Sequence, residues 1–214
     1  HNMAVTTIPT AGIANDAVDN TKLDLASNYA FTGTISGAGG FNLLQTTTVT
    51  STVASVTMGT TSILTSTYKM YCFTGSNIHV DTDGATGSAR IIQGGVEKSD
   101  SFYRFSRIRM YSGSSTVSGF VNEATDRFPD SWGESIGTSA GECTGFLGYL
   151  HDPAATDQYK VFYQTQGAQD TSRSQQLVVA SYSYTGNTNA VEGIKFYPTS
   201  GNILSGTFKV YGLL

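Results

Sequence analysis

Charge, cysteine and long apolar runs are all scarce in this sequence. Charged residues make up 13% of the 214 residues and the net charge is −4, whereas soluble domains usually contain about 25% charged residues. A surface that binds nucleic acid needs clustered lysine and arginine, so we do not expect the 12 scattered basic residues to serve a nucleic-acid partner. No apolar run approaches the roughly 18 residues of a membrane helix. We therefore expect no membrane insertion and, without a basic region before an apolar core, no secretory signal.

The residue groupings that reactive chemistry requires are missing as well. The three histidines are far apart in the sequence, and no His-x-x-x-His or Cys-x-x-Cys spacing supports a zinc site. No Gly-x-Ser-x-Gly elbow or phosphate-binding glycine loop occurs. The sequence predicts no catalytic residue, no cofactor and no metal ligand, and we expect a non-enzymatic protein. Cys72 and Cys143 stand in apolar contexts, which favours buried free thiols over a single disulfide.

Glycine and β-forming residues are abundant. The chain has 24 Gly, 12 Tyr and 11 Phe, and Thr, Val, Tyr and Phe favour half-buried strands. Because no apolar pattern of helix length separates the strand-like segments, we expect an all-β fold, an antiparallel β-sandwich or jelly roll with about eight to ten strands. The expected loops are residues 81–88, 112–116, 125–143 and 185–190.

The first 44 residues differ in character from the rest. They are small, polar and turn-rich, and their apolar residues are too sparse to form a core alone. We therefore expect an extended N-terminal anchoring arm at residues 1–44, which orders on a partner, and a β-sandwich knob at residues 45–214. The candidate docking side chains of the arm are Ile8, Ile13, Val18, Leu23, Leu25 and Phe31.

One central strand shows an irregular alternation. Tyr103 and Phe105 are in phase with each other, whereas Ile108 and Met110 are shifted by one residue. A period of two that slips by one residue predicts a bulge, here near Ser106. The three arginines of this segment are expected to form an exposed strand face, with a phosphate site as the alternative.

The last 21 residues contain two alternating runs around a Pro-Thr-Ser-Gly-Asn turn. This arrangement predicts that the chain ends on a β-hairpin. In that hairpin Ile194 and Phe196 would pair across the turn with Phe208 and Val210.

The single tryptophan offers a candidate ligand contact. Trp132 lies in a polar segment between Asp130 and Glu134, so its ring could stack on a sugar while the carboxylates bond hydroxyl groups. The alternative is a tryptophan that plugs the end of the sandwich or a seam between subunits. Sugar hydrolysis needs two carboxylates roughly 5–10 Å apart, and the spacing of acids in the sequence gives that hypothesis little support.

Two segments resemble bacteriophage virion proteins, particularly those of marine and cyanobacterial phages. IPTAGIANDAVDNTKLDLASNYAFTGTISG is similar to the low-complexity stretches that precede the distal domains of their fibres, and SGNILSGTFKVYGLL resembles the close of the same proteins. The resemblance covers about a fifth of the chain. It is more specific for the class of phage virion proteins than for a location on the virion.

The resemblance implies a capsid- or tail-attached fibre or decoration protein, commonly a homotrimer. Its partners would be copies of itself and other capsid or tail proteins. Its location would be the exposed surface of a virion that is assembled in the host cytoplasm. A receptor-binding fibre tip that reads host glycans is the alternative, and a polysaccharide depolymerase is a third hypothesis.

Overall fold

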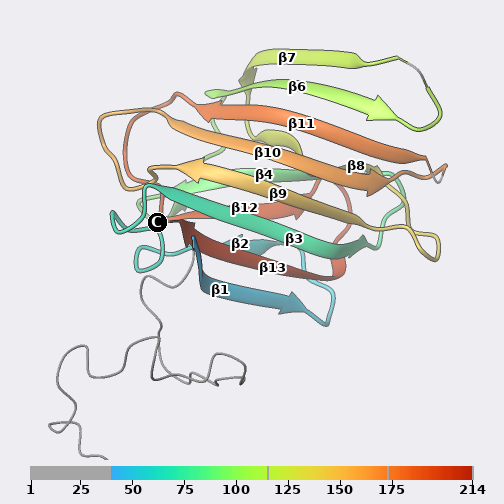
Figure 1. Ribbon diagram of the computed structural model, residues 1–214, viewed down its shortest axis with the longest axis horizontal. Coiled ribbons are helices and arrows are strands. Elements are labelled where there is room, and N and C mark those ends of the chain that lie inside the picture. The colour runs from blue at the N-terminus through green and yellow to red at the C-terminus, as the bar shows by residue number, and fades with distance from the viewer. Residues whose placement is uncertain (1–39, 115, 173, 214) are drawn as a thin grey trace, which may run out of the picture. The chain divides into compact units, whose positions relative to one another are not determined.

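The computed structural model describes residues 40–114, 116–172 and 174–213, which form two antiparallel β-sheets (Figure 1). The six candidate docking side chains of the N-terminal arm lie outside the described residues. The first strand begins at Phe41, so the boundary predicted between residues 44 and 45 falls inside a strand.

Thirteen strands are found in the described part of the chain, more than the sequence predicted. They are β1 (Phe41–Val49), β2 (Val56–Met58), β3 (Met70–Val80), β4 (Ala85–Gln93), β5 (Val96–Glu97), β6 (Tyr103–Tyr111), β7 (Ser118–Thr125), β8 (Phe128–Ile136), β9 (Thr144–His151), β10 (Lys160–Gln169), β11 (Gln175–Tyr184), β12 (Gly193–Pro198) and β13 (Ile203–Leu213).

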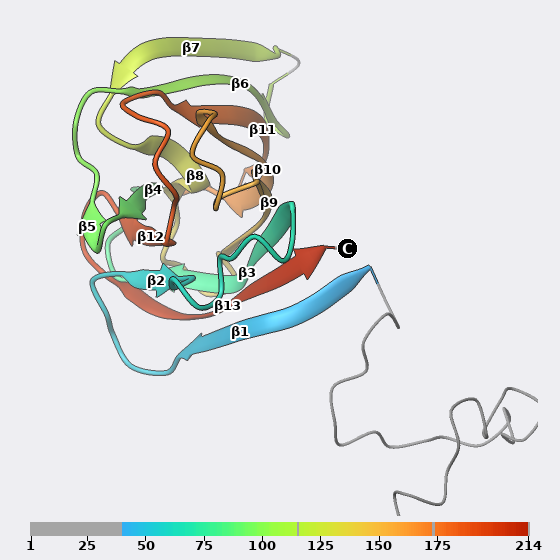
Figure 2. The ribbon, with the colours of Figure 1, turned by 90° about the vertical axis from the view of Figure 1, so that its left-hand side faces the viewer.

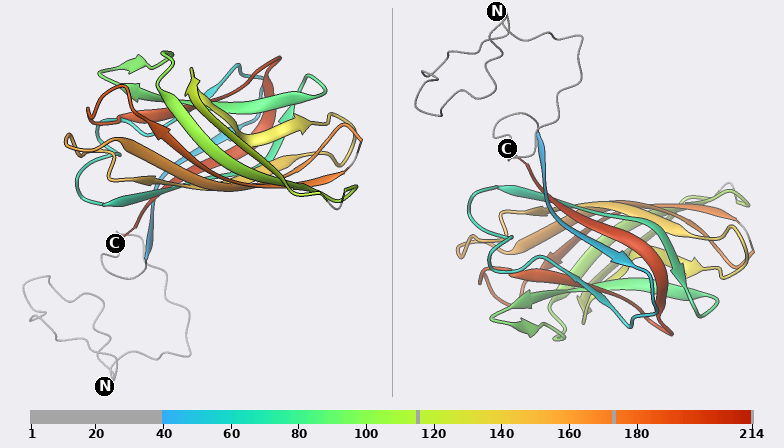
Figure 3. Two further views of the ribbon diagram at one scale, coloured as in Figure 1. Left: turned by 90° about the horizontal axis from the view of Figure 1, so that it is seen from above. Right: turned by 90° about the horizontal axis from the view of Figure 1, so that it is seen from below.

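The strands divide into a large and a small sheet. The large sheet has the order β1-β13-β3-β9-β10-β11-β6-β7, and the small sheet has the order β2-β12-β4-β5, with β8 paired to β4. Figure 2 shows β4, β5 and β12 on one side and β9, β10 and β11 on the other, and Figure 3 shows β1 and β13 running together along one edge. The all-β sandwich expected from composition is confirmed, and no helix in the described residues is long and apolar enough to cross a membrane.

Aromatic rings fill the space between the sheets. Phe162 of β10 stacks on Phe128 of β8 at 5.8 Å between ring centroids, and Phe73 of β3 meets Phe162 edge-on at 6.1 Å. The ring centroids of Phe196 of β12 and Phe146 of β9 are 5.1 Å apart. Such pairs add about 0.5–1.5 kcal/mol each beyond the burial of their surface, so side chains from both sheets hold the sandwich together.

The predicted C-terminal hairpin is wrong. β12 pairs with β2 and β4, whereas β13 pairs with β1 and β3. The turn between them therefore carries the chain from one sheet to the other. Phe196 and Phe208 face each other across the core, with 5.9 Å between their ring centroids, instead of lying side by side in one sheet.

The predicted slip in the strand around Ser106 is also wrong. β6 keeps an unbroken alternation and pairs with β11 without irregularity; its one register shift, against β7, lies between Tyr103 and Phe105. The consequence is that Arg107 faces inward with Phe105, while Ile108 faces solvent and is 52% exposed.

Candidate functional site

Trp132 is a core residue. It lies on β8, inside the segment predicted as a loop, and its side chain is completely buried. The indole Nε1 donates a hydrogen bond to the carbonyl oxygen of Ser88 at 2.9 Å. A Cβ placed on Gly87 would come within 2.2 Å of the ring, so β4 lacks a side chain where the indole packs. The ring is closed to a sugar, and of the two alternatives for Trp132 the structure supports packing within the sandwich.

Two left-handed residues explain why β8 departs from strict alternation. Asp130 has φ of 51° and Ser135 has φ of 49°, a conformation that bends a strand and re-aims its side chains. As a result Asp130, Ser131 and Trp132 are all buried although they are consecutive. Sequence alternation could not reveal a strand whose consecutive side chains all turn inward.

Asp130 and Glu134 are brought together with the arginines of β6. Arg107 forms an ion pair with Asp130 and lies 3.8 Å from Glu134, and Arg109 pairs with Glu134. The side chains of Arg107 and Asp130 are only 8% and 12% exposed. Burial lowers the pKa of Arg107, although the charge of Glu134 opposes that shift. The predicted exposed arginine face is therefore wrong for these two residues, and both carboxylates are engaged within the fold.

Phe120 of β7 completes this cluster. The guanidinium carbon of Arg107 lies 4.6 Å from the Phe120 ring centroid, and that of Arg109 lies 4.9 Å away. A cation over an aromatic face is attracted by the ring quadrupole. The edge hairpin of β6 and β7 is thus fixed to β8 by paired charges and ring contacts.

The outer face of the small sheet carries a second set of ion pairs. Arg90 of β4 bonds Glu97 of β5 at 2.9 Å and also pairs with Asp126, while Lys195 of β12 bonds Glu97 at 2.6 Å. Burial raises the pKa of Glu97, but hydrogen bonds from Lys195 and Arg90 outweigh it and hold that pKa below its usual range. This face has the mixed charge that is typical of a solvated surface.

The outer face of the large sheet has the opposite character. The outward residues of β9, β10, β11 and β6 include no acid and one arginine, Arg104, whose Nε donates to Thr185 at 3.2 Å. Apolar side chains between 37% and 81% exposed take the place of charges on these strands and on β7. They are Ile108, Met110, Val121, Leu147, Val161, Tyr163 and Leu177.

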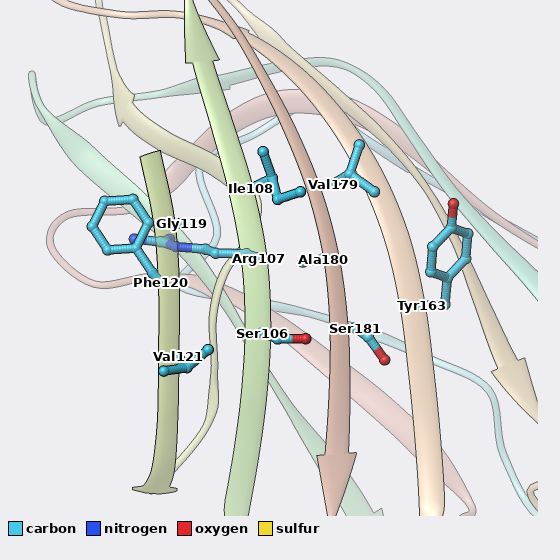
Figure 4. Close-up of a pocket in the computed structure, with 10 residues that line it drawn as sticks. All are labelled: Ser106, Arg107, Ile108, Gly119, Phe120, Val121, Tyr163, Val179, Ala180 and Ser181. Atoms are coloured by element: carbon cyan, nitrogen blue, oxygen red, sulfur yellow. The ribbon is translucent and has the colours of Figure 1, made fainter. Parts of the chain in front are cut away.

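A shallow groove of about 480 Å³ crosses this face. Figure 4 shows Tyr163 on one side, Val121 on the other, and the small side chains of Ser181 and Ser106 between them. The row passes over β10, β11, β6 and β7 in turn. A neighbouring hollow of about 570 Å³ adds Asn122 and continues the groove along β11, β6 and β7.

Sequence reasoning missed this groove because it expected the arginines of β6 to form the exposed face of the strand, which leaves Ile108 and Met110 on the opposite face. One signal in the sequence could have shown that Ile108 and Met110 face outward. Arg107 and Arg109 are in phase with the aromatic residues at positions 103 and 105, so both arginines face inward if those rings do. Two inward arginines need buried carboxylates opposite them. Those acids are Asp130 and Glu134.

The two cysteines are both free. Cys72 is buried, as predicted, and burial raises the pKa of its thiol to about 11. Cys143 is only half-buried, which differs from the prediction, because it lies in the loop before β9. Among the described residues, no cluster of three or more potential metal ligands is present.

Comparison of the chain with protein-family models, with curated proteins and with solved structures finds no match.

Proposed function

We propose that this protein is a non-enzymatic structural component of a bacteriophage virion, a capsid- or tail-attached fibre or decoration protein that displays its sandwich. In this proposal the N-terminal segment attaches the chain to the particle. The motifs at both ends of the sequence support assignment to the class of phage virion proteins. The architecture of the sandwich supports separate roles for the N-terminal segment, which attaches, and the sandwich, which is displayed.

One observation carries the proposal. The hydrophobic core of the described residues extends from Val49 to Val210 and draws on both sheets. These core side chains belong to one compact unit of the chain, Gly39–Leu214. In the proposal, the sparse apolar side chains of the N-terminal segment serve to bind another surface.

The first experiment locates the protein. Antibodies against the sandwich should label the surface of purified virions in negative-stain images. A copy lacking residues 1–40 should keep the circular dichroism of the full chain and disappear from the virions. Absence of the full-length chain from virions would refute the structural role, and full retention of the truncated chain would refute attachment by the arm.

A point-substitution pair tests the same attachment in the intact chain. Replacing Val18 and Leu23 with serine removes apolar contacts, so attachment should fall at least tenfold. Replacing Asn20 and Asn28 with serine in the same segment changes polar residues only and should leave attachment at the wild-type level. Equal attachment by the two variants would contradict docking through apolar side chains.

Host-glycan binding is not assigned to the residues first considered for it. Trp132 is buried, and Asp130 and Glu134 are paired with arginines. A sugar cannot reach the indole face without opening the sandwich.

A further inference from the structure

We propose that two copies of this chain associate through the outer face of the large sheet, with a two-fold axis along β11. The inference rests on the described sandwich and does not depend on the virion role, because it concerns residues of β6, β7, β9, β10 and β11 only. Its occupant is a second copy of the same face.

The first argument is the contrast between the two outer faces. The small sheet presents the charges of Arg90, Glu97 and Lys195, which suit water. The large sheet presents aliphatic side chains, tyrosine and methionine with little charge. Depletion of charge and enrichment of Tyr and Met are the features that distinguish the centre of a protein interface from ordinary surface. An apolar face of this size marks an interaction site.

The second argument is that large and small residues in register with each other lie on opposite sides of β11. One outward row runs Tyr149, Tyr163, Ser181, Ser106 and Val121 across β9, β10, β11, β6 and β7. The large rings lie on one side of β11 and the smaller side chains on the other. A two-fold rotation about β11 therefore places Tyr163 of one copy above Ser106 of the other.

The next rows show the same complementarity. Leu147 of β9 and Gly119 of β7 are equally distant from β11, two strands to either side. A Cβ on Gly119 would meet nothing within 4 Å, so the space above it can take the leucine of a second copy. Met110 of β6 and Gly167 of β10 flank Leu177 of β11 in a further row. In the proposed pair, three large side chains of each copy therefore lie above three small residues of the other copy. The pairs are Tyr163 with Ser106, Leu147 with Gly119, and Met110 with Gly167.

The position of the axis follows from these rows. An axis along β10 would stack Tyr163 on its own copy and place Leu147 above Val179, so large residues would oppose large residues. An axis along β11 puts the outward residues of β11 opposite their own copies, namely Gln175, Leu177, Val179, Ser181 and Ser183. A two-fold contact is self-complementary by definition, because each residue that meets a partner is met in return.

The area is sufficient for a stable pair. The seven apolar side chains of this face and of β7, between 37% and 81% exposed, offer on the order of 600 Å² per copy. The serine, threonine and glycine residues between them bring the contact to about 800 Å² per partner, the size of a standard interface.

The test measures the mass of the intact chain by size-exclusion chromatography with light scattering. The expected mass is twice 22.7 kDa, or an even multiple of it. A monomer or a trimer overturns the proposal. Ser106→Tyr fills the position that Tyr163 of the second copy occupies and should raise the dissociation constant at least tenfold. Thr46→Tyr, the control, introduces a tyrosine at an exposed position of β1 and should have no effect.

A cysteine pair locates the axis and decides the question if Ser106→Tyr fails to fold. Ser181→Cys lies on the axis, where facing sheets about 10 Å apart are too distant for a disulfide, so a short bis-maleimide should link the two thiols well above the level formed by the native thiols. Thr46→Cys lies far from the axis and should stay at the native level. Equal cross-linking of the two variants, or no loss of association in a folded Ser106→Tyr protein, overturns the pairing through this face.

Discussion

Trp132→Phe should destabilise the sandwich strongly, because the indole is a packed and hydrogen-bonded core group. The substitution leaves the carbonyl of Ser88 without its 2.9 Å donor, which costs about 1–3 kcal/mol in a buried setting. The smaller ring adds about 1 kcal/mol for the lost volume. A total near 2–4 kcal/mol lowers Tm by roughly 5–15 °C in a domain of this size.

Thermal unfolding followed by circular dichroism measures this effect. The native protein supplies a second readout, since Trp132 is the only tryptophan and its emission should shift to longer wavelength in the same transition. Gly87→Ala approaches the contact from the other side, because its Cβ would lie 2.2 Å from the indole. The overpacking should cost about 1–3 kcal/mol. Gly113→Ala meets only ordinary contact at 3.6 Å and serves as the control.

A Tm within 1 °C of wild type for both Trp132→Phe and Gly87→Ala, on a scale of roughly 2–4 °C per kcal/mol, would refute this packing. Loss of sugar binding by Trp132→Phe at unchanged Tm would restore the ligand-contact interpretation of the indole.

Three further outcomes follow from the charged and thiol groups. Arg107→Met leaves the carboxylate of Asp130 buried without its partner and should cost about 3–5 kcal/mol in urea unfolding; combining it with Asp130→Asn should recover a large part of that loss. The lowered pKa of Glu97 means that its carboxylate stabilises the fold above the ordinary value of 4.5 and that this contribution is lost as pH falls through the folded-state pKa. Glu97→Gln should therefore cost about 0.5–1 kcal/mol at pH 7 and nothing at pH 2, whereas an equal deficit at both pH values would contradict the linkage. Cys143 should react with a thiol reagent at pH 8 well before Cys72, whose pKa is raised to about 11, and simultaneous reaction of the two in the folded protein would show that Cys72 is accessible.

The fold class could be predicted from the sequence because it depends on the local preference of residues for β-strands. Thr, Val, Tyr and Phe alternate over β10 and β11, and the structure places Phe162 and Tyr182 inward as that alternation requires. Strand pairing depends on distant contacts instead. Phe196 and Phe208 point into the core whether their strands share a sheet or face each other, so alternation alone could not distinguish a hairpin from a crossing between sheets.

The candidate site could not be predicted, because it depends on which polar groups are paired. Arg107 is inward only because β8 presents Asp130 opposite it, and β8 does so through a left-handed backbone at that residue. Without that knowledge, Ile108 is the natural choice for the core. The left-handed backbone of β8 also places Trp132 inside the sandwich. The inward position of Arg107 turns Ile108 outward, where it lines the apolar groove.

Hydroxyl-radical labelling of the full-length chain over a range of concentrations tests most directly whether a second copy covers the large sheet. Tyr163 is 41% exposed and Phe41, on the opposite edge of the same sheet, is 54% exposed in the single chain. Association about β11 predicts that Tyr163 is protected at high concentration and becomes labelled on dilution, while Phe41 reacts at a constant rate. Equal labelling of both residues at every concentration would contradict the association.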